Sequence, residues 1–158
     1  MAGTLFLKEV STYALSTSDC ASLANNIATT AIGLNLDNRS SAAAPNSALA
    51  IFQLQCSFNA TTALSVNTDI ADLYLLPAMD GSTFPTIGTS QIAPPFQVGS
   101  FINSASTVAV STVVTYVTDP KGVDLFPVLY KAAIVNVSGQ TINSSWSLKV
   151  SLAQGNYS

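Results

Sequence analysis

Apolar and polar residues alternate along much of this chain, and a period of two is typical of a β-strand with one face in a core. The clearest segment spans residues 48–58, where every second residue is apolar and the intervening residues include Gln53 and Gln55. Residues 146–152 repeat the alternation near the end of the sequence. Both segments predict half-buried antiparallel strands.

Five further segments contain the β-branched, aromatic or alternating residues that favour strands. They are residues 5–10, 70–76, 96–102, 107–118 and 125–137. Turn sequences follow at Asp80-Gly81, at residues 119–122 and at residues 138–140. We expect Pro77 to end the second of these strands, whereas Pro127 favours an edge position or a later start for the last one. Seven or eight strands at short intervals predict an all-β fold, either an antiparallel β-sandwich or a jelly roll.

One segment departs from this pattern. Residues 19–31 are rich in alanine, and Leu23, Ile27 and Ala31 have the spacing of one helix face. Asp19 could cap the first turn. The segment therefore predicts a short helix within an otherwise all-β chain.

The sequence contains neither an internal repeat nor a linker that would divide it. We therefore expect a single domain over residues 1–158. Residues 1–13 could form an N-terminal arm, because chain termini are often ordered only by a partner. Residues 40–47 and 81–95 are expected to be long surface loops, which are commonly functional.

Charged residues make up 8% of the chain, against about 25% in typical soluble domains. A surface kept polar by Ser, Thr and Asn favours a protein that packs against neighbours, and the alternative is an extracellular β domain with few charges. Five cationic residues and a net charge of -3 exclude a basic stripe for nucleic acid. No apolar run approaches 18 residues, so we expect no membrane partner.

The residue types needed for catalysis are scarce. The chain has no histidine, which removes the usual general base and the commonest transition-metal ligand. Two pairs of carboxylates remain, Asp69 with Asp72 and Asp119 with Asp124, but aspartates at strand ends and turns usually bind the local backbone. The sequence contains no phosphate-binding or dinucleotide-binding motif. We expect no enzyme activity, no metal site and no cofactor.

Two cysteines and one tryptophan have structural interpretations. Cys56 lies within the apolar alternation, so a buried free thiol is expected, with a bridge to Cys20 left open. Trp146 precedes an alternating strand and is expected in the core, although an exposed tryptophan could serve as a platform for sugars.

Candidate interface residues lie in or beside the proline-containing loop and at the N-terminus. Aromatic side chains on loops can anchor an interface, or they can fold back onto their own sandwich. The candidates are Phe84, Pro85, Pro94, Pro95, Phe96, Phe101, Leu5 and Phe6.

Five segments occur in an order that resembles a known family. They are SLANN (22–26), LDN (36–38), DLYLLPAMDGSTFP (72–85), PPFQVG (94–99) and KAAIVNVSGQ (131–140). In this order they resemble small virion structural proteins of tailed bacteriophages. None of the segments carries a catalytic motif.

The resemblance implies a component of a virus particle. The first hypothesis is a capsid cement or decoration protein on the capsid exterior, which bridges major capsid protein subunits and assembles with copies of itself as a trimer or dimer. A second hypothesis places the protein in the tail, neck or baseplate. A third, from a different class, is a host- or glycan-binding adhesion module with Trp146 as its aromatic platform.

Overall fold

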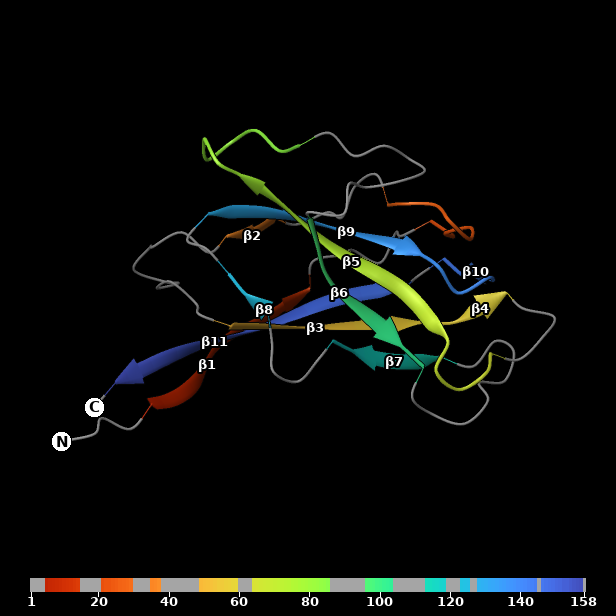
Figure 1. The fold of residues 1–158 in the computed structure, drawn as a ribbon, viewed down its shortest axis with the longest axis horizontal. Coiled ribbons are helices and arrows are strands. Elements are labelled where there is room, and N and C mark those ends of the chain that lie inside the picture. The colour runs from red at the N-terminus through yellow and green to blue at the C-terminus, as the bar shows by residue number, and fades with distance from the viewer. Residues whose placement is uncertain are drawn as a thin grey trace.

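Strand pairing joins the two ends of the chain in the computed structural model (Figure 1). The structure describes residues 5–14, 21–29, 35–37, 49–59, 64–85, 96–103, 113–118, 123–125, 128–144 and 146–157. Within these residues the first strand pairs with the last, and Leu5 lies opposite Tyr157.

The described residues form eleven strands and three antiparallel sheets. The strands are β1 (Leu5–Ala14), β2 (Asn35–Asp37), β3 (Leu49–Cys56), β4 (Phe58–Asn59), β5 (Asp69–Ala78), β6 (Gln97–Ile102), β7 (Val114–Val117), β8 (Val123–Asp124), β9 (Leu129–Asn136), β10 (Thr141–Ile142) and β11 (Ser147–Tyr157). One sheet has the order β1-β11-β3-β7, with β8 also paired to β3, and is called the β3 sheet below. The second, called the β5 sheet, has the order β2-β9-β5-β6. Strands β4 and β10 form a small third sheet.

The pairing of the eight strands with at least three residues is nested. The first of these strands pairs with the eighth (β1 with β11), the second with the seventh (β2 with β9), the third with the sixth (β3 with β7) and the fourth with the fifth (β5 with β6). Nested pairs of this kind form one long antiparallel hairpin. When this hairpin folds over on itself, β11 pairs with β3 and β9 pairs with β5. This connectivity is that of a jelly roll, and it confirms the predicted all-β sandwich.

The core between the two sheets follows from the alternation in the sequence. In β3 the side chains of Ala50, Phe52, Leu54 and Cys56 are buried, whereas Gln55 is exposed. Apolar side chains of the β5 sheet complete the same cluster, and burial of each such side chain contributes roughly 1.5–3 kcal/mol. Its largest fully buried members are Phe52, Phe101, Leu36, Leu54, Ile70, Leu73, Ile134, Ile142, Leu148 and Leu152.

The β5 sheet is covered on both faces. A second, smaller cluster on its outer side contains Tyr74, Leu76, Ala133 and Val135, and Ala28 packs onto it. This second cluster explains why β5 and β9 read as nearly continuous apolar runs rather than as alternating strands, since both of their faces are buried. The outer face of the β3 sheet differs, because its described side chains are polar or only partly buried.

The predicted helix at residues 19–31 is wrong over residues 21–29, which are extended and turn structure. Leu23 forms an isolated bridge with Ile142, and Ala28 forms one with Val135. Between them lies a turn in which Asn26 has a φ of 60°, a left-handed conformation that asparagine tolerates. Pairing with distant strands therefore outweighs the local helical spacing. Over the described residues no helix is long and apolar enough to cross a membrane.

Two further expectations change in detail. Strand β5 continues through Pro77 to Ala78 instead of ending at the proline. The pairing of β5 with β6 stops at Tyr74, whereas the pairing with β9 continues to Ala78. Pro77 therefore has a paired strand on one side only, and a proline, which lacks an amide donor, is tolerated at such an edge position. At the N-terminus, residues 5–14 form strand β1 within the sheet rather than a free arm.

Candidate functional site

No contact among the described residues brings the carboxylates considered for catalysis together as an acid–base pair. Asp69 is exposed at the start of β5, whereas Asp72 accepts a hydrogen bond of 2.7 Å at Oδ1 from the hydroxyl of Ser100. Asp119 lies outside the described residues, and Asp124 lies in β8. In the part of the chain that the structure describes, no three metal-ligating side chains come together.

Trp146 and Cys56 belong to the core. Trp146 is only 4% exposed, and its Nε1 donates a hydrogen bond of 3.1 Å to the carbonyl oxygen of Ala21. It is therefore not an exposed platform for a sugar ring. Cys56 is a buried free thiol, as expected, and burial raises its pKa to about 12. The thiolate required of a nucleophile is not accessible near neutral pH.

The candidate interface residues separate into different environments. Phe84 and Pro85 are half-buried beyond β5, and Phe96 is half-buried against the smaller cluster. Phe101 is fully buried in the main core. This side chain therefore folds back onto its own sandwich, which was the alternative to an interface role. Pro94 and Pro95 lie outside the described residues.

Leu5 and Phe6, the N-terminal interface candidates, lie in β1 opposite Tyr157 and Asn156. Strand β1 is the outermost strand of the β3 sheet, so its backbone has a paired neighbour in β11 on one side. Because Leu5 and Phe6 lie in an edge strand, a contact between them and another chain stays a proposal.

The five segments singled out in the sequence come together in or beside the β5 sheet. Segments 36–38, 72–85, 94–99 and 131–140 contribute β2, β5, β6 and β9, which are neighbours in that sheet. Segment 22–26 contacts segment 131–140, because the backbone amide of Gly139 donates a 2.8 Å hydrogen bond to Asn25 Oδ1. These segments therefore describe one sheet and its cover rather than a constellation of reactive groups.

A buried turn explains the polar residues of the last segment. Asn136 is fully buried, and its Nδ2 donates to the carbonyl oxygens of Leu23 at 2.8 Å and Gln140 at 2.6 Å. Its Oδ1 accepts hydrogen bonds from the amide and the hydroxyl of Ser138, at 3.0 and 2.7 Å. Every polar atom of the Asn136 side chain thus has a structural partner.

The loop after β5 presents an exposed apolar side chain next to an exposed carboxylate. We call residues 79–83 the β5 tip. Met79 is 80% exposed, and the amide of Gly81 donates a 3.0 Å hydrogen bond to the carbonyl oxygen of Ala78. Gly81 has a φ of 82°, a conformation that glycine adopts without strain. In Figure 1 the tip extends beyond the arrowhead of β5, on the opposite side of the view from β7.

Asp80 fixes the shape of this tip. Its Oδ1 accepts hydrogen bonds from the backbone amides of Ser82 at 2.9 Å and Thr83 at 2.6 Å. The hydroxyl and amide of Thr83, together with the amide of Ser82, hold the pKa of the Asp80 carboxyl well below its usual range. The tip therefore carries a fixed negative charge at neutral pH and at mildly acidic pH.

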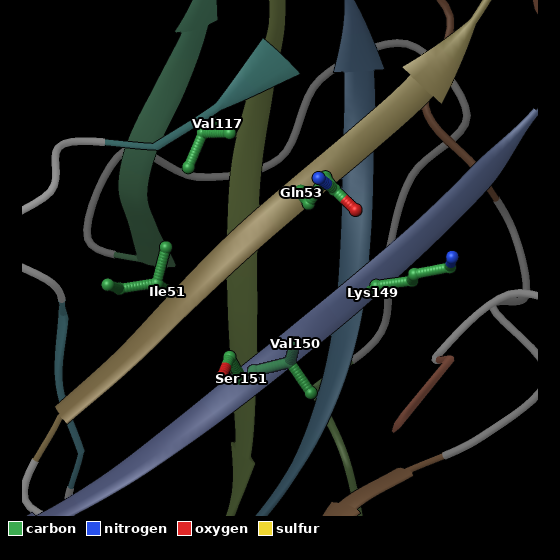
Figure 2. A pocket seen from close by; sticks show the side chains of 6 residues that line it. All are labelled: Ile51, Gln53, Val117, Lys149, Val150 and Ser151. Carbon is green, nitrogen blue, oxygen red and sulfur yellow. The ribbon is translucent and has the colours of Figure 1, made fainter. Parts of the chain in front are cut away.

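A shallow depression lies on the outer face of the β3 sheet. Its volume is about 240 Å³, and it is lined by Ile51, Gln53, Val117, Lys149, Val150 and Ser151, of which Val150 belongs to the core. Figure 2 shows that these residues come from the adjacent strands β3, β7 and β11. Val117 is 50% exposed, and Lys149 is exposed. We call this feature the sheet depression.

Sequence reasoning missed the sheet depression because its residues are far apart in the chain. Ile51 was the one available signal, since it is apolar on the face where Gln53 and Gln55 are polar. Register then completes the site, because Gln53 lies opposite both Lys149 and Val117.

Comparison of the chain with protein-family models, with curated proteins and with solved structures gives no significant match.

Proposed function

We propose that this chain is a non-enzymatic structural protein of a tailed-bacteriophage virion. In the favoured form of this proposal it is a capsid cement or decoration protein on the exterior of the head, where it bridges major capsid protein subunits and contacts copies of itself. The observation that carries the proposal is the combination of a jelly roll with an outer sheet face whose described side chains are exposed or only partly buried, in a chain with 8% charged residues.

The physical argument concerns what such a protein needs. A component added in many copies to a symmetric shell needs contact area and few repulsive charges, but no assembled reactive groups. The outer face of the β3 sheet supplies neutral polar and aliphatic side chains, among them Gln53, Thr115 and Val117. Jelly rolls recur in viral capsid proteins, although they also occur in lectins and in other functions, so the fold is supporting and not decisive.

The direct test is electron cryo-microscopy of intact particles that contain this chain. Density for the jelly roll on the outside of the head, between capsid subunits, is the expected result. Density confined to the tail, neck or baseplate would instead favour the second hypothesis, which shares the same supporting observations. A chain found in no particle would overturn both.

The adhesion-module hypothesis is the weakest of the three. It relied on Trp146 as an exposed aromatic platform, and this side chain is buried. A glycan-binding role would therefore need a different surface of the molecule.

A further inference from the structure

The sheet depression combines apolar walls with one cation. Ile51 and Val117 provide the apolar part, and the side chain of Lys149 provides the charge (Figure 2). Of the charged residues whose side chains the structure describes, Lys149 lies on this face, whereas Asp69, Asp72, Asp80 and Lys131 belong to the β5 sheet or its tip. The strand pairing also places Glu9 opposite Ala153 and Asp124 opposite Leu49 in this sheet, four residues along β11 and β3 from Lys149 and Gln53. The ammonium group has no hydrogen-bond or ion-pair partner among the described residues.

The β5 tip has the complementary chemistry in a complementary shape. Met79 is an exposed, flexible apolar side chain of a kind that adapts to irregular gaps, and Asp80 next to it is an exposed carboxylate. The hydrogen bonds from Ser82 and Thr83 to Asp80 hold the tip in one shape before any contact forms. A preformed loop loses less conformational entropy on binding than a mobile one.

We propose that the β5 tip of one copy docks into the sheet depression of a second copy, with Met79 against Ile51 and Val117 and with Asp80 beside Lys149. The partner is thus a second copy of this chain. The opposite charges of Asp80 and Lys149, together with the apolar side chains beside each of them, favour this occupant.

The contact is head-to-tail, since the tip follows β5 and the depression lies on the other sheet. Each copy therefore donates one tip and accepts another. A heterologous contact of this kind closes into a ring when the rotation between copies permits it. The inference rests on the proposed function for its biological role, because a ring is a suitable unit to span several capsid subunits.

The first experiment measures self-association of the purified chain by sedimentation velocity. The variants Asp80→Asn and Lys149→Gln each remove one charge, and asparagine retains the oxygen that accepts from Ser82 and Thr83. The matched controls are Asp69→Asn, an exposed carboxylate at the other end of β5, and Lys131→Gln, a cation of the other sheet. We expect each test variant to weaken association by about tenfold, and the double variant to be little worse than either single one.

The second experiment locates the contact by disulfide trapping in a Cys20→Ser background. A Met79→Cys chain mixed with a Val117→Cys chain should form a covalent dimer under mild oxidation. A Met79→Cys chain mixed with an Ile102→Cys chain is the control, because Ile102 is also exposed but lies in the β5 sheet. Buried Cys56 is expected to stay unreactive in all of these chains.

A wild-type chain that remains monomeric up to roughly 1 mM would overturn the inference. An oligomer that is unaffected by both charge variants, or that crosslinks equally in the control, would overturn it as well. Failure of this inference is distinct from failure of the proposed function. Single copies bound separately on the head would refute the ring and retain the virion role, whereas rings that no particle contains would do the reverse.

Discussion

The side-chain amide of Asn136 donates a 2.8 Å hydrogen bond to the carbonyl oxygen of Leu23, which lies 113 residues earlier in the chain. Around this contact, the backbone amide of Asn26 donates to the backbone carbonyl oxygen of Asn136, and the backbone amide of Asn136 donates to the carbonyl oxygen of Ile27. One buried residue thus fastens the segment 21–29 along β9. The contact also explains why this segment is not a helix, since its backbone groups are committed to distant partners.

Replacing Asn136 by alanine should lower the free energy of unfolding by about 2–4 kcal/mol. The substitution removes four hydrogen bonds, two to the carbonyl oxygens of Leu23 and Gln140 and two from the amide and hydroxyl of Ser138. The carbonyl oxygens keep other donors, the amide of Ile142 and the hydroxyl of Ser138, so the cost comes from the lost bonds themselves, each about 0.5–1.5 kcal/mol. Urea unfolding followed by the fluorescence of Trp146 measures the change. Asn25→Ala, which removes a single hydrogen bond to Gly139, should cost only about 1 kcal/mol. Equal losses for the two variants would contradict the central role of Asn136.

The sequence predicts those parts of the fold that depend on local alternation. The regular burial of β3, and the placement of Trp146 and Cys56 in the core, follow from a period of two. The nested order of the strands could not be predicted in the same way. It depends on which strands meet across the whole chain, and the sequence gives no direct measure of that.

The errors and omissions share this non-local cause. Leu23 and Ile27 have helical spacing, yet Leu23 pairs with Ile142, and Asn26 turns the chain between them. The sheet depression was missed because it joins Ile51, Val117 and Lys149 only through register. The alternation does predict which face these positions occupy, and the pairing of β3 with β7 and β11 then places them together.

The β5 tip should keep its shape when the pH falls from 7 to about 4. The folded pKa of Asp80 is lowered, so the stabilisation is present above the unfolded value of about 3.9 and is lost only as the pH falls through the lower folded value. Amide resonances of Ser82 and Thr83, followed by NMR during an acid titration, provide the measurement. In Asp80→Asn these resonances should lose the acid transition. A midpoint near 4 in the wild-type chain would show that the carboxyl is not held by these amides.

Replacing Tyr116 by phenylalanine should leave the protein equally stable or stabilise it by up to about 1 kcal/mol. The ring of Tyr116 is buried in the core, but its hydroxyl has no hydrogen-bond partner among the described residues, and an unpaired buried hydroxyl is unfavourable. Thermal unfolding at fixed pH measures the difference. The control is Tyr130→Phe, because Tyr130 is similarly buried in the same cluster but has an interaction partner. This control should bring no gain in stability. A clear loss of stability in Tyr116→Phe would reveal a partner for its hydroxyl.

The stability of the fold should decline at alkaline pH because of Cys56. Burial raises the folded pKa of this thiol from its ordinary value of 9.0 to about 12. The unfolded chain therefore releases a proton that the folded chain retains. The stabilisation is complete below pH 9 and decreases by roughly 1 kcal/mol per pH unit as the pH rises toward the folded value.

Cys56→Ala separates this effect from other alkaline titrations. The variant should be less stable than the wild type at pH 7, because it loses buried volume, but its stability should decline less steeply above pH 9. Tyr116, whose pKa is also raised to about 12 by burial and to a smaller extent by Cys56, remains as a second source of alkaline sensitivity. The measurement is urea unfolding at a series of pH values between 7 and 11. Parallel pH profiles for the two chains would mean that the Cys56 thiol titrates in the folded state as it does in water, which its burial in β3 should not allow.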